Sequence, residues 1–381
     1  MSSSLKELER PLGQTVSRRR GLIGRLPYKP IVSSLALVAV IAVAGMIATR
    51  DRPFRDPSTS VVSTPEITTQ PPAVAATPPA AKPAEGPAII QLPKDKPSTG
   101  RIVISDPSAI GQDLRVAHLP DQELLEDGET GPLPIRAADG RRPFDVYARP
   151  WSGARGARVV IVLGGLGLSQ TGTQAAIAKL PAEVTLAFAP QGNSIGRWMQ
   201  EARRKGHEIV MQVPLEPFDY PAVNPGRNTL TVEAEAEANL ENLRWALSRT
   251  TNYTGVMNYM GARFSADADA MQPMLAELGQ RGLLYFDDGS SARTTAPELA
   301  LKNGVPFAAG DNTIDGNRSR GAILKKLDEL ESTARAKGFA IGSGSVFDET
   351  VDAVSSWVDE ARKRGIEIVP ISAVATDPEQ G

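Results

Sequence analysis

The chain contains no cysteine and only two histidines among its 381 residues. The lack of cysteine excludes a disulfide, a thiolate metal ligand and a cysteine nucleophile. Its 42 Lys and Arg side chains nearly balance 44 Asp and Glu, so we expect no nucleic acid among its partners. The sequence also lacks the GxGxxG and GxxxxGK[ST] motifs, so we expect no phosphate-binding loop and no bound cofactor.

One long apolar run precedes the globular part. Residues 31–48, IVSSLALVAVIAVAGMIA, carry no charge and are just long enough to cross the hydrocarbon core of a membrane. The tail 1–30 is rich in Arg and Lys near this run, which predicts that it stays in the cytoplasm. We therefore expect a single-pass signal anchor in a bacterial inner membrane, with the rest of the chain in the periplasm. The alternatives are a cleaved signal peptide, which the pair Arg18 and Arg19 would favour, and a buried core helix.

Two further segments separate this run from the main domain. Residues 49–100 are rich in Pro, Ala and Thr and hold too few large apolar residues to build a core, so we expect a disordered linker. At roughly 3 Å per residue, such a linker could reach on the order of 100 Å from the membrane. Residues 101–150 mix apolar positions such as Phe144 with polar stretches, and we expect them to form an N-terminal strap along the outside of the domain at 151–376.

Within that domain, short apolar runs alternate with helical patterns. We expect strands at 159–163, 184–189, 208–213, 253–260, 283–286, 305–308, 339–341 and 367–371. We expect helices at 170–180, 194–205, 233–248, 267–280, 297–302, 320–336 and 350–364. Unbroken apolar runs are typical of parallel strands that are buried on both faces. Seven or eight such units predict an α/β domain with a (β/α)7-8 barrel-like fold, and a doubly wound open sheet is the alternative.

In a parallel barrel the chemistry takes place at the C-terminal ends of the strands. Here those ends read LGGLGLS (163–169), FAPQGN (188–193), MQVPLEPFDYP (211–221), MNYMGARF (257–264), FDDGSS (286–291), AGDNTID (309–315) and IGSGS (341–345). The first of them supplies Gly164 and Gly165, which have no side chain to offer.

This set of segments, in this order, resembles the divergent polysaccharide deacetylase family. These proteins are relatives of carbohydrate esterases that remove acetyl groups from amino sugars with a metal held by Asp and His. The resemblance covers about 142–373 and rests on the combination of VTLAFAP, GHEIVMQVPLEP, NPG, MGARF and GIEIVPIS. It implies a barrel of the glycoside hydrolase/deacetylase type and a role in the metabolism of cell-envelope carbohydrate.

The chain departs from the family pattern at the metal-ligand positions. Members that keep the metal have two aspartates where this chain has Gly164 and Gly165, and they have histidines where it has Gln212, Tyr259 and Ser343. A zinc site needs about three protein ligands from His, Asp or Glu. The resemblance therefore implies that no metal is bound in the family manner.

Neither histidine of the chain can replace the missing ligands. His118 precedes the domain, and His207 stands at the start of a predicted strand, opposite the expected site. The serines at the strand ends also lack a nearby histidine base, which argues against a hydrolytic triad.

Acidic and amide side chains remain at the strand ends. Asp287 and Glu216 are the candidates for general acid–base catalysis. The candidates for substrate binding are Gln212, Asn258, Tyr259, Arg263, Asp288 and Asp311. Alternatively, these side chains tie loops together, for instance through an ion pair between Arg263 and Asp287.

Two functions follow from these observations. The first is a metal-free, non-catalytic domain that binds an envelope glycan or an envelope protein. The second is a working carbohydrate hydrolase or deacetylase that uses the remaining carboxylates. The scarcity of histidine favours the first.

The membrane orientation leads to a first prediction. Alkaline phosphatase, which folds actively only outside the cytoplasm, should be active when it is fused after Lys96 and inactive when it is fused after Pro30, because only the first junction lies beyond residues 31–48. Inactivity at Lys96, or release of the intact protein by washing the membranes, would contradict the anchor.

Overall fold

The computed structural model describes residues 111–113 and 115–380. The predicted tail (1–30), anchor (31–48) and linker (49–100), together with the start of the strap, lie outside these described residues. Within the described part of the chain, no helix is both long enough and apolar enough to span a membrane.

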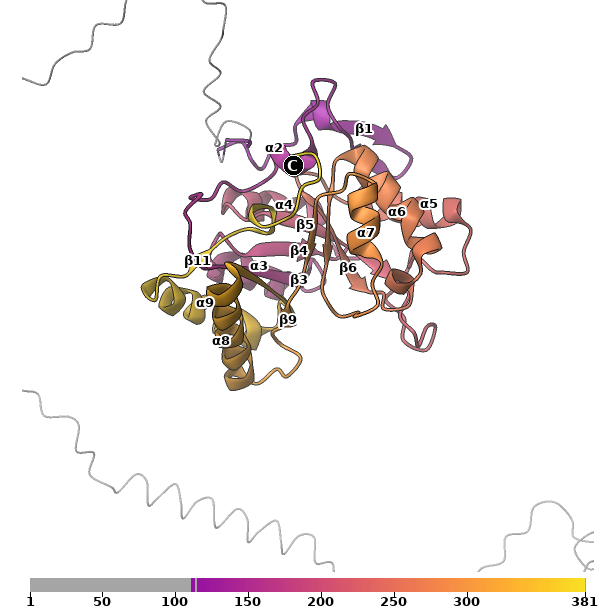
Figure 1. The fold of residues 1–381 in the computed structure, drawn as a ribbon. Helices are drawn as coiled ribbons and strands as arrows, with labels where there is room; N and C mark the ends of the chain where they lie inside the picture. Colours follow the sequence, from indigo (N-terminus) through magenta and orange to yellow (C-terminus); the bar gives the residue numbers. More distant parts are fainter. Residues whose placement is uncertain (1–110, 114, 381) are drawn as a thin grey trace, which may run out of the picture. The chain divides into compact units, whose positions relative to one another are not determined.

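The domain is built around one parallel sheet (Figure 1). Its strands are β3 (Arg158–Leu166), β4 (Thr185–Phe188), β5 (Ile209–Leu215), β6 (Gly255–Met260), β7 (Leu284–Asp287), β8 (Phe307–Ala309), β9 (Asn312–Thr313), β10 (Phe339–Ser345) and β11 (Glu367–Ile368). The hydrogen-bonded order is β8-β7-β6-β5-β4-β3-β10-β9, and β11 pairs with β3. Strands that follow one another in the chain are thus neighbours from β3 through to β8, as in a barrel.

The two ends of this strand order are consecutive in the chain. Only Gly310 and Asp311 separate β8 from β9. The Gly310 N–H donates to the carbonyl of Asp287 in β7 (2.8 Å), and the Asp311 N–H donates to the carbonyl of Ile341 in β10 (2.8 Å). The segment β8–β9 therefore acts as one interrupted strand: its first part pairs with β7 and its second part pairs with β10. Because β7 and β10 lie toward opposite ends of the strand order, this double pairing curves the sheet round. The predicted barrel-like α/β architecture is confirmed, and the doubly wound alternative is wrong.

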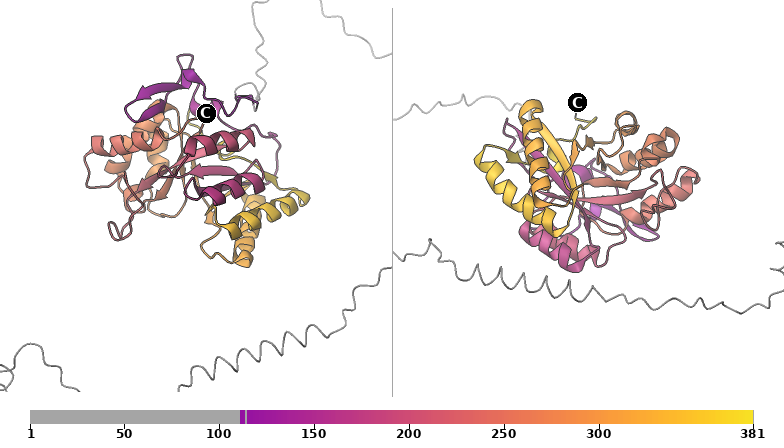
Figure 2. Two further views of the ribbon diagram at one scale, coloured as in Figure 1. Left: turned by 180° about the vertical axis from the view of Figure 1, so that it is seen from behind. Right: turned by 90° about the horizontal axis from the view of Figure 1, so that it is seen from below.

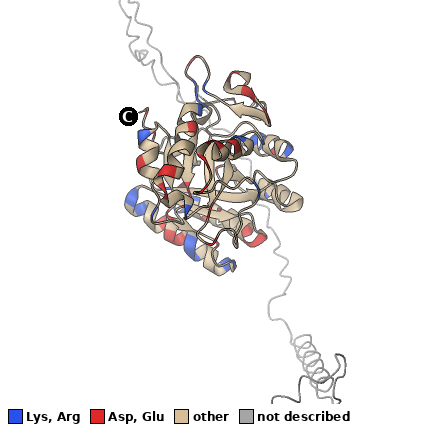
Figure 3. Ribbon diagram, turned by 90° about the vertical axis from the view of Figure 1, so that its right-hand side faces the viewer, with Lys and Arg blue, Asp and Glu red and all other residues tan. Residues whose placement is uncertain are grey.

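The helices lie around the outside of the sheet (Figure 2). They are α3 (Gln170–Lys179), α4 (Ile195–Arg204), α5 (Ala236–Leu247), α6 (Ala268–Arg281), α7 (Ala296–Lys302), α8 (Arg320–Lys337) and α9 (Asp348–Lys363). Local sequence sets several of their ends. The Ser169 hydroxyl accepts from the Gly172 N–H at the start of α3 (3.1 Å), and Asp267 accepts from the Ala270 N–H at the start of α6 (3.0 Å). Acidic and basic residues are interspersed over these helices (Figure 3).

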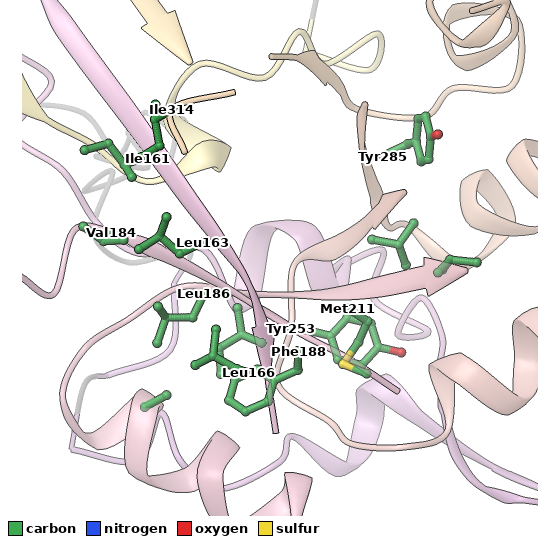
Figure 4. Packing of buried hydrophobic residues seen from close by; sticks show 14 of the residues in the cluster. Ile161, Leu163, Leu166, Val184, Leu186, Phe188, Met211, Tyr253, Tyr285 and Ile314 are labelled. Atoms are coloured by element: carbon green, nitrogen blue, oxygen red, sulfur yellow. The ribbon is translucent and has the colours of Figure 1, made fainter. Parts of the chain in front are cut away.

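The strands are apolar because both of their faces are buried. In β3, Ile161 and Leu163 belong to the large cluster between sheet and helices, which Figure 4 shows from close by. Val160 and Val162 belong to a separate cluster that fills the inside of the curved sheet. That inner cluster also includes Ala187, Val210, Met257, Leu284, Phe286, Ala308 and Ile341, which come from strands all round the sheet. Residues that alternate along a strand therefore serve two different cores.

The strap is more structured than its sequence suggests. It contains the short helix η2 (Gln122–Leu124), the hairpin strands β1 (Leu125–Gly128) and β2 (Gly131–Pro134), and helix α2 (Pro143–Val146). Phe144 of α2 packs into the inner cluster, and its N–H donates to the carbonyl of Gly282 (3.1 Å), just before β7. The strap thus inserts a side chain at the N-terminal end of the barrel and does not lie only along its outside.

Some element boundaries differ from the expected ones. β3 continues past Leu163 to Leu166, with an irregular register against β4 between these two residues. The short strand β9 was not expected, and β11 ends at Ile368. A Cβ at Gly192 would lie 2.8 Å from the carbonyl carbon of Gly167, so the glycine turn after β3 allows two backbones to come close together.

The position of Phe144 generates a stability prediction. Phe144→Ala should lower the free energy of unfolding by about 3–5 kcal/mol, because it empties the end of the inner core. Urea denaturation of the purified protein measures this loss. Phe218→Ala is the matched control, since Phe218 is 57% exposed and should cost less than about 1 kcal/mol. Equal losses from the two substitutions would contradict the role given to Phe144.

Candidate functional site

A cavity of about 740 Å³ opens at the C-terminal ends of the strands. Its walls come from the ends of β3, β5, β6 and β10 and from the loops that follow β4 and β7. This is where parallel barrels carry their sites, and the volume is ordinary for a small-molecule site. A larger groove of about 940 Å³ lies between the strap hairpin and helices α5 and α6. We place the candidate site in the first cavity because it lies at the strand ends.

The contact between Gly164 and Gln212 shapes the floor of the cavity. Gln212 is 6% exposed, and its Oε1 accepts from the Gly165 N–H (2.9 Å). A Cβ built on Gly164 would lie 2.6 Å from Gln212 Nε2. The carboxamide therefore occupies the space that a Cβ at position 164 would need, and a side chain there would have to displace it. Its Nε2 makes no hydrogen bond to the residues that the structure describes, and it can donate into the cavity.

Asn258 and Asp288 form a second part of the wall. Asn258 is nearly buried; its Oδ1 accepts from the Asp288 N–H (2.7 Å), and its Nδ2 donates to the Met260 carbonyl (2.8 Å). Asn258 thus fixes the loop that carries Asp288. The Asp288 Oδ1 accepts from the Ser290 N–H (2.9 Å).

Tyr259 presents an aromatic ring at the cavity. The residue is 39% exposed although it lines the wall. A half-exposed ring beside amide and carboxylate groups is suited to stacking on a sugar ring.

Asp287 does not line the cavity. Burial raises the pKa of its carboxyl group, as a general acid would require. Both of its oxygens are occupied, however. Oδ1 accepts from the Gly289 N–H (2.9 Å), and Oδ2 accepts from the Thr294 hydroxyl (2.7 Å). In this arrangement Asp287 shapes the loop after β7.

Glu216 and Arg263 bind each other outside the cavity wall. Arg263 donates to Glu216 Oε1 (2.5 Å) and to Glu233 (2.6 Å), and the Val232 N–H donates to Glu216 Oε2 (2.6 Å). The expected pair between Arg263 and Asp287 is therefore wrong: Arg263 instead ties the loop after β5 to the loop after β6.

Asp311 is also engaged elsewhere. Its Oδ2 accepts from the Ile341 N–H (2.9 Å), and its Oδ1 pairs with Lys337 (3.1 Å). It secures the junction between β8 and β9 against β10 and does not line the cavity. Of the eight candidates, the cavity wall brings together Gln212, Asn258, Tyr259 and Asp288.

The structure adds residues that were not among the candidates. Asp315 lines the cavity, as do Thr313, Ser345 and Phe347. Asp315 belongs to the segment 309–315. Its strand-end position was a signal for it, but no feature of the sequence distinguishes it from Asp311.

The two histidines lie away from the cavity. Burial lowers the pKa of His207 to about 4, and its Nδ1 lies 2.9 Å from the carbonyl oxygen of Val184. His118 lies in the strap. Neither is among the residues that line the cavity.

The architecture defines a parallel barrel-like domain with a strand-end cavity. A family model described as divergent polysaccharide deacetylase matches residues 161–375, more than half of the chain. The chain therefore belongs to the divergent polysaccharide deacetylase family, which confirms the resemblance carried by the strand-end motifs.

Similar proteins are known from several bacteria. An uncharacterized protein of Agrobacterium tumefaciens C58 of known crystal structure is 55% identical, with a TM-score of 0.63, over 64% of this chain and 99% of that one. The uncharacterized protein YibQ of Escherichia coli K12 is 21% identical over 203 residues, which are 53% of this chain and 63% of YibQ. An uncharacterized protein of Haemophilus influenzae is 24% identical over 170 residues, which are 45% of this chain and 60% of that one. The chain thus spans less than two thirds of the length of these two curated relatives.

A metal centre of the family kind does not fit these residues. The positions that the family resemblance assigns to metal ligands hold Gly164, Gly165, Gln212, Tyr259 and Ser343. None of these is a carboxylate or an imidazole, and the Gln212 carboxamide fills the space beside Gly164. In the range 115–380, no three His, Asp or Glu side chains are grouped so that they could hold a metal ion.

The contact between Gly164 and Gln212 can be measured with a double-mutant cycle. Gly164→Ala should lower the free energy of unfolding by about 1–2 kcal/mol, because it displaces the carboxamide and breaks its bond to Gly165. In a Gln212→Ala background the same substitution should cost little, which gives a coupling of about 1 kcal/mol.

Gly196→Ala in α4 is the control for this cycle. A Cβ there meets no atom within 4 Å, so the substitution should not destabilise the protein. Strictly additive effects of Gly164→Ala and Gln212→Ala would show that the two positions do not constrain each other.

Proposed function

We propose that this protein is a metal-free, non-catalytic member of its family that binds glycan of the bacterial cell envelope. The observation that carries the proposal is the Gln212 carboxamide, which lies where a side chain at position 164 would have to stand. Family members that keep the metal have an acidic residue at position 164 and a histidine at position 212. Glycine at position 164 leaves the space that the Gln212 carboxamide fills. This fit favours a site that has acquired a different function over one that has only lost its metal.

The chemistry of the cavity suits a sugar. Gln212 offers an amide donor, Asp288 and Asp315 offer acceptors, and Tyr259 offers a ring. Hydroxyl groups need donors and acceptors of this kind, and the apolar face of a sugar packs on an aromatic side chain. A cavity of about 740 Å³ has room for such a ligand.

The same proposal includes the place of the protein in the cell. The apolar run 31–48 would anchor it in the inner membrane, and residues 49–100 would carry the domain into the periplasm. Envelope glycans are accessible there. An envelope protein is the alternative partner.

Glycan binding tests the proposal. Binding of amino-sugar oligosaccharides, followed by titration calorimetry, should be unchanged by a strong chelator, because no metal takes part. Tyr259→Ala should weaken binding by about 1 kcal/mol, roughly fivefold in Kd, through the loss of one stacking contact. Phe218→Ala is the control, since Phe218 is an exposed aromatic residue that does not line the cavity.

Catalysis would contradict the proposal. Metal-dependent release of acetate from acetylated amino sugars by the wild-type protein, abolished by Asp287→Asn or Glu216→Gln, would support the alternative of a working deacetylase that uses the remaining carboxylates.

A further inference from the structure

The cavity carries charge of one sign. Asp288 and Asp315 line it, and no Lys, Arg or His of the described chain is among its lining residues. We propose that its ligand is a de-N-acetylated amino sugar, whose free amine is a cation, and that acetylated and anionic sugars bind more weakly. This inference rests on the glycan-binding function proposed above and names the class of glycan.

Asp315 is buried but has one oxygen available. The residue is 7% exposed. Its Oδ2 accepts from the Ser345 N–H (2.7 Å) and from the Thr350 hydroxyl (3.1 Å). Its Oδ1 makes no hydrogen bond, and the carboxylate forms no ion pair, with the residues that the structure describes. The two bonds to Oδ2 hold the carboxylate in place and leave Oδ1 free for a ligand.

Asp288 is arranged in a similar way. Its backbone is fixed by Asn258 (2.7 Å), and its Oδ1 accepts from the Ser290 N–H (2.9 Å). Within the described part of the chain, its Oδ2 accepts no hydrogen bond and the carboxylate has no cationic partner. Both lining carboxylates therefore differ from Glu216 and Asp311, which pair with Arg263 (2.5 Å) and Lys337 (3.1 Å) outside the cavity.

A carboxylate in a largely buried wall lacks a compensating positive charge when no cation lies beside it. Removing a charged group from water is costly unless an opposite charge or hydrogen bonds compensate it. An ammonium group provides both, since it has three N–H donors and a positive charge. An acetylated amine has one N–H and no charge, and an anionic sugar would be repelled.

Other groups of the wall fit the rest of such a sugar. Gln212 Nε2 can donate to a hydroxyl group, and the Tyr259 ring can cover an apolar face. The guanidinium of Arg318 lies 3.7 Å from the ring centroid of Phe347. Phe347 lines the cavity but Arg318 does not, and Arg318 forms no ion pair with Asp288 or Asp315 in the described part of the chain.

The test compares two ligands with the purified full-length protein. Titration calorimetry in mildly acidic buffer measures Kd for a glucosamine oligosaccharide and for its fully N-acetylated counterpart of the same length. We expect the amine form to bind at least about tenfold more tightly, because a charge-assisted hydrogen bond contributes a free energy of this size. The double variant Asp288→Asn and Asp315→Asn should lose most of this preference, because its affinity for the amine form should fall much further than its affinity for the acetylated form.

Two controls separate the cavity from other acidic surfaces. Asp311→Asn removes a carboxylate outside the cavity and should leave the preference unchanged. Glu241→Gln removes a carboxylate from the groove between the strap hairpin and α5, where a polycation could also collect. If Asp315→Asn lowers Tm, the single variant Asp288→Asn is used in its place. Asparagine at position 288 keeps the Oδ1 that accepts from the Ser290 N–H, so this variant should stay folded and must still reduce the preference.

The outcomes are distinguishable. Equal affinity for the two forms overturns this inference and leaves glycan binding intact. A preference that survives in the double variant but is lost in Glu241→Gln overturns the assignment to the cavity. Binding of neither oligosaccharide contradicts the glycan-binding proposal, and this inference is then overturned with it.

Discussion

The steric exclusion between Gly164 and Gln212 governs the candidate site. Gly164 lies on β3 and Gln212 on β5, on either side of β4. A Cβ on Gly164 would lie 2.6 Å from Gln212 Nε2, so a side chain at position 164 would require the carboxamide to leave its present place. The chain places the side chain on β5 and the glycine on β3. The carboxamide in turn holds the Gly165 N–H (2.9 Å) and leaves an amide donor at the cavity floor. The amide donor of the cavity follows from this arrangement, whereas Asp288 and Asp315 are held by other contacts.

The carboxylates of the strand ends fall into two groups. In the first group, both carboxylate oxygens accept hydrogen bonds from neighbouring loops or strands, so these residues have a structural role. The group consists of Glu216, Asp287 and Asp311. Asp288 and Asp315 keep one oxygen each for the cavity. An acidic strand end is therefore not by itself evidence of acid–base chemistry in this fold. What separates the groups is whether a neighbouring segment brings an Arg, a Lys, a hydroxyl or an N–H to the second oxygen.

Much of the fold could be predicted from sequence, because it depends on local patterns. Apolar runs such as Val159–Leu163 mark the parallel strands, and the strand-end motifs identify the family. The site could be predicted only in part. That Gln212, Asn258, Tyr259 and Asp288 share one wall follows from their positions at strand ends. The partner of Arg263 could not be predicted, since it depends on the path of the long loop after β5, which brings Glu233 and Val232 back to Glu216. The strap hairpin was missed because β1 and β2 are short and hold few buried residues.

We propose that the strand-end cavity is a metal-free binding site at the place where relatives hold a metal. Equilibrium dialysis of the full-length protein against zinc, followed by metal analysis, tests it most directly. The account predicts far less than one zinc per chain, with no difference between the wild type and the Asp288→Asn, Asp315→Asn double variant. One tightly held zinc per chain that is lost in the double variant would contradict it, because the free carboxylates would then be metal ligands.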